Sequence, residues 1–149
     1  MKKFKATPLQ KNIENLTDTM FTVNTRGLGV TYAIVSGSIF YALEHRNSLV
    51  RIHCKNGFIG VVQNFATIKR QSWLLDHFAI KEVKCEKDFY RIILVNKSVI
   101  YFTKDVKIGS NFSFDLLYID NNTDNITNEE FAELTRRCKK FCMVTTKVG

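Results

Sequence analysis

MFTVNTRGLGVTY, residues Met20–Tyr32, contains a short apolar run, a glycine loop and the start of a helical pattern. A strand, loop and helix in this order form a phosphate cradle, because loop N–H groups and the positive helix end converge on one anion. In the pattern G-x-x-x-x-G-K-[ST], Gly29 is the second glycine and Thr31 the hydroxyl residue. Asn24 stands at the first glycine and Val30 at the lysine. The stretch predicts a phosphate site that keeps its shape and lacks its charge.

Alternating strand and helix patterns continue on both sides of this stretch. Apolar runs predict strands at residues 20–23, 49–54, 114–119 and 141–145, and helical spacing predicts helices at residues 9–16, 31–44, 57–75 and 127–140. Thr127 and Glu130 have the spacing of a capping box at the start of the last helix. From Ile80 to Phe102 the apolar period changes to two, with Asn96-Lys97 as a turn. We therefore expect one α/β domain over residues 1–149, with a parallel sheet centre and an antiparallel ribbon around 80–102.

Composition narrows the class of protein. The chain has 149 residues, of which 45% are hydrophobic, and it lacks the run of roughly 18 apolar residues that a membrane span needs. The basic N-terminal segment has no apolar stretch after it, so we expect an unsecreted, cytoplasmic protein with no membrane partner. The four cysteines form no C-x-x-C pair and are predicted to be core thiols, and the three histidines are interpreted as structural or surface residues.

The net charge is +8, from 22 basic and 14 acidic residues. An excess of this size favours polyanionic partners such as DNA or another nucleic acid, although a solvated basic face is the alternative. The candidate nucleic-acid contacts are Lys2, Lys3, Lys5, Arg136, Arg137, Lys139 and Lys140.

An acid-tipped apolar strand is the second element of the predicted site. Phe114–Ile119 is apolar except at Asp115 and is followed by Asp120, which we expect at the carboxyl edge of the sheet near the glycine loop. There Thr31 and Asp120 are candidate ligands of Mg²⁺ bound with ATP. Asn121 follows where hydrolytic enzymes of this kind place a glutamate, and loss of such a base lowers rates by roughly 10²–10⁴. The contact missing at Val30 is worth about 1.5–3 kcal/mol, so ATP and Mg²⁺ binding is expected to be weak or lost.

Taken in order, these motifs resemble the ATPase domain of the large terminase subunit, the DNA-packaging motor of tailed bacteriophages and a P-loop NTPase. The segments that carry the resemblance are Leu9-Gln10, like the adenine-recognising segment; Thr25–Thr31, like the phosphate loop; Asn96–Ile100, like an N-G-S-x-I hairpin; Asp115–Asn121, like the acidic strand; and Met143–Gly149, like the T-T-P-x-G coupling segment. The resemblance implies a P-loop NTPase-like fold in a short and degenerate version. The chain is not expected to be a complete motor.

The resemblance also implies roles for individual residues. The implied nucleotide-binding residues are Gln10, Asn24, Thr25, Arg26, Gly27, Gly29, Val30 and Thr31. Of these, Gln10 would face adenine and Arg26 the outer phosphates. Thr31 and Asp120 would hold the metal, and Asn121 would occupy the catalytic position next to Asp120. Thr145 and Thr146 would couple nucleotide state to movement.

Three functions are compatible with this pattern. The first is a small phage-type protein, in the host cytoplasm, whose catalytically weak or inactive fold binds nucleic acid or a protein partner. The second is an active ATPase of DNA packaging or remodelling, in which Arg26 or a partner supplies the missing charge. The third is an ATPase-mimicking inhibitor or modulator of a host or phage machine.

Overall fold

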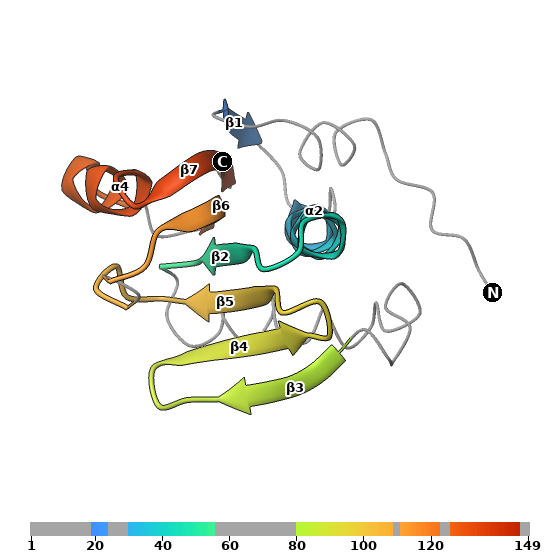
Figure 1. The fold of residues 1–149 in the computed structure, drawn as a ribbon. Coiled ribbons are helices and arrows are strands. Elements are labelled where there is room, and N and C mark those ends of the chain that lie inside the picture. The colour runs from blue at the N-terminus through green and yellow to red at the C-terminus, as the bar shows by residue number, and fades with distance from the viewer. Residues whose placement is uncertain (1–18, 24–29, 56–79, 109–110, 123–125, 147–149) are drawn as a thin grey trace.

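The computed structural model describes residues 19–23, 30–55, 80–108, 111–122 and 126–146. Within these ranges the chain forms one seven-stranded sheet (Figure 1). Its strands are β1 (Thr19–Val23), β2 (Leu49–His53), β3 (Ile80–Cys85), β4 (Phe89–Leu94), β5 (Val99–Thr103), β6 (Phe114–Asn122) and β7 (Cys138–Thr146). The strand order across the sheet is β1-β7-β6-β2-β5-β4-β3.

The sheet has a parallel part and an antiparallel part. Strands β1, β7, β6, β2 and β5 are parallel to one another, β4 pairs antiparallel with β5, and β3 pairs antiparallel with β4. The turn between β4 and β5 contains Lys97 with a positive φ of 72°, as the turn signal at Asn96-Lys97 predicts. The parallel centre and the antiparallel ribbon are both confirmed.

The two described helices cover opposite faces of the sheet. Helix α2 (Val30–Glu44) packs with Val50, Ile52, Leu116 and Tyr118 in one core cluster. Helix α4 (Asn128–Thr135) packs through Leu134 and Phe131 against Leu117 and Ile119 in a second cluster. Neighbouring residues of β6 therefore serve different cores, because side chains alternate across a strand. Apart from the partly exposed Asp115, the predicted run Phe114–Ile119 is buried on both faces, as expected of a central parallel strand.

The capping box at the start of α4 is confirmed. The Thr127 hydroxyl accepts the Glu130 N–H at 3.1 Å, and the Glu130 carboxylate accepts the Thr127 N–H at 3.0 Å. The predicted end of this helix, near Lys140, is wrong, because α4 ends at Thr135 and β7 begins at Cys138. The Arg137 carbonyl accepts the Phe114 N–H at 2.7 Å, so strand pairing with β6 begins where the helix would have continued.

Other expectations have mixed outcomes. The predicted helices at residues 9–16 and 57–75 lie outside the described residues. Among the described helices none is long and apolar enough to span a membrane.

The cysteines differ in their surroundings. None of the four, all of which the structure describes, forms a disulfide; Cys54 and Cys142 are buried, but Cys85 is exposed on edge strand β3 and is not a core thiol. Burial raises the pKa of Cys142 to about 11, which keeps that thiol protonated and unreactive.

Candidate phosphate and metal site

The structure brings Thr31 and Asp120 into direct contact. Thr31 lies in the first turn of α2, and Asp120 lies near the carboxyl end of β6. The Thr31 hydroxyl donates a hydrogen bond to Asp120 Oδ2 at 3.0 Å, across 89 positions of sequence. Asp120 is only 3% exposed. A hydroxyl at a helix N-terminus and a strand-end carboxylate therefore meet at one edge of the parallel sheet.

This pair suits a hard divalent cation that also holds phosphate. Mg²⁺ prefers oxygen ligands and is commonly held by one or two protein groups, phosphates and waters. The positive end of a helix of this length also favours an anion beside Thr31. Within the described residues no cluster of three or more His, Cys, Asp or Glu side chains is present, so a metal here would depend on ligand and water oxygens. The metal role of Thr31 and Asp120 stays a prediction.

Val30 takes part in the core. Its side chain is 9% exposed and belongs to the cluster that includes Ala33 and Ile34 of the same helix. The residue at the lysine position therefore contributes packing to the start of α2. A lysine here would have to extend its stem past the core surface to carry its ammonium group to the loop.

Asn121 forms a polar link on the other face of β6. Its Nδ2 donates a hydrogen bond to Thr145 Oγ1 at 3.1 Å, and its Oδ1 accepts the Ile126 N–H at 3.2 Å. Asn121, Thr145 and Thr146 are all buried. The amide thus connects β6, β7 and the approach to α4, and it provides no carboxylate to deprotonate a water molecule. The coupling role of Thr145 and Thr146 is not tested by these contacts.

One ion pair at the same edge of the sheet was not predicted from the sequence. Lys55, just after β2, donates to Glu130 Oε1 of α4 at 2.8 Å. This contact, with the backbone N–H of Thr127, lowers the pKa of Glu130. The capping box placed Glu130 at the start of the helix, but no local signal connects it to a residue 75 positions earlier.

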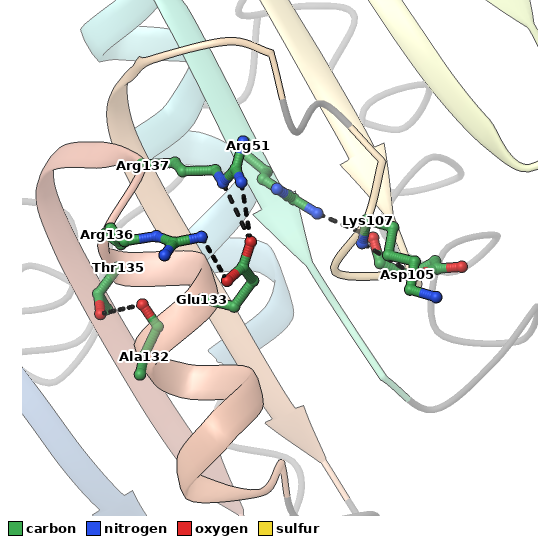
Figure 2. Close-up of polar contacts among 8 residues, drawn as sticks. All are labelled: Arg51, Asp105, Lys107, Ala132, Glu133, Thr135, Arg136 and Arg137. Carbon is green, nitrogen blue, oxygen red and sulfur yellow. Dashed lines mark hydrogen bonds and ion pairs between the residues drawn. The ribbon is translucent and has the colours of Figure 1, made fainter.

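The basic residues after α4 are partly neutralised (Figure 2). Glu133 pairs with Arg136 at 2.7 Å and with Arg137 at 3.0 Å, and Lys139 pairs with Asp115 at 3.1 Å. The Arg136 and Lys139 side chains are nevertheless 65% and 68% exposed. These residues form a turn and the start of a strand, where a continuous basic helix had been expected.

The remaining predicted site residues lie outside the described residues. They are Gln10, Asn24, Thr25, Arg26, Gly27 and Gly29 of the nucleotide site, and Lys2, Lys3 and Lys5 of the basic N-terminus. The roles proposed for them stay predictions.

Strand order, helix placement and the Thr31–Asp120 contact define a P-loop NTPase-like α/β fold. The chain is similar to the large terminase of a thermophilic bacteriophage in complex with ATP-gamma-S, with a TM-score of 0.69 and 13% identity over 95% of this chain and 38% of that chain. The ADP complex of that terminase gives a TM-score of 0.63 and 11% identity over 96% and 39% of the two chains. The large terminase ATPase domain of Thermus phage P74-26 gives a TM-score of 0.63 and 15% identity over 98% of this chain and 66% of that chain.

At these identities the likeness shows the fold, which is that of large terminase ATPase domains, as the resemblance in sequence predicts. The chain spans about two fifths of the length of the thermophilic phage terminases that it matches. No protein-family model and no curated protein sequence matches the chain.

Proposed function

We propose that this chain is a terminase-like nucleotide-binding domain with weak or no ATP hydrolysis, which acts through a nucleic-acid or protein partner. The observation that carries the proposal is the hydrogen bond from Thr31 to Asp120 at the carboxyl edge of the sheet. It supports a surviving site for Mg²⁺ and phosphate. Val30 and Asn121 lack the charge and the base that fast turnover requires. The nucleotide complexes known for two of the similar structures are consistent with ATP or ADP as the ligand.

Replacing Val30 by lysine tests the nucleotide site. The added ammonium group would contribute about 1.5–3 kcal/mol to phosphate binding, because hydrogen bonds to charged groups have this strength. The affinity for ATP with Mg²⁺, measured by calorimetry, is therefore expected to rise roughly tenfold to a hundredfold.

Val30→Met is the matched control for that experiment. It replaces the same buried valine with a long side chain that carries no charge, and thermal melting of both variants reports any loss of packing. Equal ATP affinities for the lysine and methionine variants, with both proteins folded, would contradict a phosphate site at the start of α2.

Nucleic acid is the partner that the charge favours. The chain carries a net charge of +8, and the exposed Arg136 and Lys139 lie within four residues of each other on the turn into β7. Their ion pairs with Glu133 and Asp115 lie at the protein surface, where such pairs are worth about 0–1 kcal/mol, so exchange with a phosphate group carries little penalty.

The double variant Arg136→Gln, Lys139→Gln tests this surface. If both side chains contact phosphates, the slope of log affinity for DNA against log salt concentration should become shallower by roughly 0.7–0.9 per lost contact. Lys81→Gln is the matched control, since Lys81 is an exposed lysine on edge strand β3 at the far side of the sheet. An unchanged slope in the double variant, or an equal change in the control, would place the nucleic-acid contacts elsewhere.

A further inference from the structure

A second polar cluster lies inside the protein on the face of β2 that points away from α2. Val50 and Ile52 belong to the core beneath α2, and Arg51 and His53 alternate with them on the opposite face. Arg51 is 1% exposed and His53 is 0% exposed. A guanidinium and an imidazole are therefore buried two residues apart on one side of the sheet.

Hydrogen bonds within the protein satisfy some of the polar atoms of Arg51 and His53. Arg51 Nε donates to Thr103 Oγ1 at 2.9 Å, and Arg51 Nη2 donates to the Asp105 carbonyl at 2.9 Å. His53 Nδ1 is hydrogen-bonded to the same Thr103 hydroxyl at 2.9 Å. Figure 2 shows the Arg51 side chain between Arg137 and Asp105, and its guanidinium carbon lies 5.4 Å from the centre of the Phe114 ring.

Two nitrogen atoms of the cluster have no acceptor or donor in the part of the chain that the structure describes. They are Arg51 Nη1 and His53 Nε2. Because Thr103 Oγ1 accepts the Arg51 Nε–H, its own proton can be donated to His53 Nδ1, and we assign the imidazole proton to Nε2 on this basis. Both nitrogens are then N–H donors. Leaving a buried donor unsatisfied costs roughly 1–3 kcal/mol, and more when the group is charged.

Burial lowers the pKa of Arg51 to about 10, so the guanidinium stays charged at neutral pH. The Asp105 carboxylate is a negative charge near Arg51 and raises the pKa of the guanidinium, although the hydrogen bond from Arg51 goes to the Asp105 carbonyl. Burial, followed by the nearby charge of Arg51, lowers the pKa of His53 to about 3, so the imidazole is neutral there.

Three carboxylates lie around the cluster, and two of them form ion pairs with other groups. They are Asp105, which accepts the Lys107 N–H; Glu130, which pairs with Lys55; and Glu133, which pairs with Arg136 and Arg137. Arg137 and Lys55 add positive charge near Arg51 and His53 respectively. The two buried donors, Arg51 Nη1 and His53 Nε2, thus lie in described surroundings that contain charges of both signs.

We propose that Arg51 and His53 bind a small monovalent anion of the size of chloride inside the domain. The anion would accept the N–H groups of Arg51 Nη1 and His53 Nε2 and would lie beside the buried positive charge of Arg51. Complete burial of both side chains favours a small ion over a phosphate ester or a peptide carboxylate. Asp120 lies on the α2 face of β6, so this site is separate from the proposed nucleotide site and stands or falls independently of it.

Chloride-dependent stability tests the proposal. The unfolding midpoint of the full chain is measured in urea while chloride replaces gluconate at constant ionic strength. A native-state ligand raises the ratio of folded to unfolded protein by about a hundredfold when its concentration reaches 100 times Kd. We expect this rise for the wild type and its loss in Arg51→Met. Arg46→Met is the control, because Arg46 is an exposed arginine between α2 and β2, and it should keep the chloride dependence.

A direct measurement covers the case in which Arg51→Met does not fold. Crystals of the wild-type protein grown in bromide are expected to show an anomalous peak within hydrogen-bond distance of Arg51 Nη1 and His53 Nε2. A water molecule or a protein oxygen at that position would overturn the proposal. So would a wild-type midpoint that does not change with chloride, or a chloride dependence shared equally by Arg51→Met.

Discussion

Replacing Asp120 by asparagine is expected to remove most Mg²⁺-dependent nucleotide binding. The Asp120 carboxylate is buried at the carboxyl edge and is held by the Thr31 hydroxyl, so it is preorganised to face a cation. The amide has nearly the same shape and can still accept the Thr31 hydrogen bond, but it carries no charge. Since charge-assisted contacts are worth about 1.5–3 kcal/mol, the affinity measured by calorimetry should fall roughly tenfold to a hundredfold.

Asp88→Asn is the control for this substitution. Asp88 is exposed between β3 and β4, and the change removes the same charge far from the carboxyl ends of β6 and β7. Its ATP affinity should equal that of the wild type. If Asp120→Asn binds ATP with Mg²⁺ as tightly as Asp88→Asn does, then Asp120 has no part in holding the metal.

Replacing Asn121 by glutamate is expected to raise ATP hydrolysis. Asn121 follows the Asp120 carboxylate on β6, and its amide binds Thr145 and the Ile126 N–H without offering a base. A positioned carboxylate that accepts the proton of an attacking water contributes roughly 10²–10⁴ in rate. We therefore expect phosphate release to increase by at least tenfold in Asn121→Glu, measured at saturating ATP and Mg²⁺.

Asn121→Gln separates the base from the change in length. Glutamine has the length of glutamate but cannot accept a proton at neutral pH, so it should leave phosphate release unchanged. Both variants alter the buried contact with Thr145, and the free energy of unfolding of each should be compared with that of the wild type. Equal rates for the glutamate and glutamine variants would show that a missing base does not limit turnover.

Local periodicity predicted much of the fold. The apolar run ending at Asp120 was assigned to a central parallel strand because both of its faces are apolar, and the structure buries it between two cores. The change of apolar period after Ile80 predicted the antiparallel ribbon for an equally local reason. The contact between Thr31 and Asp120 followed from a general rule, namely that the carboxyl ends of parallel strands meet at one edge.

The features that the sequence did not predict depend on contacts between residues that are far apart in the chain. The segment from Arg136 to Lys140 contains good helix formers and no glycine or proline, so nothing local ends the helix at Thr135. The helix ends there because the backbone pairs with β6, which is a tertiary effect. The buried cluster around Arg51 was missed for a related reason. Thr103 and Asp105, which bind the Arg51 guanidinium, lie more than 50 positions away in sequence.

We propose that the sheet edge at Thr31 and Asp120 binds a nucleotide through Mg²⁺. The most direct test is a calorimetric titration of the wild-type protein with ATP-gamma-S, performed with Mg²⁺ and repeated with excess EDTA. We expect saturable binding of one nucleotide per chain, which weakens strongly when Mg²⁺ is removed. If binding does not saturate at nucleotide concentrations of about 1 mM, the binding free energy is weaker than roughly −4 kcal/mol. That result would contradict a nucleotide site at this edge of the sheet.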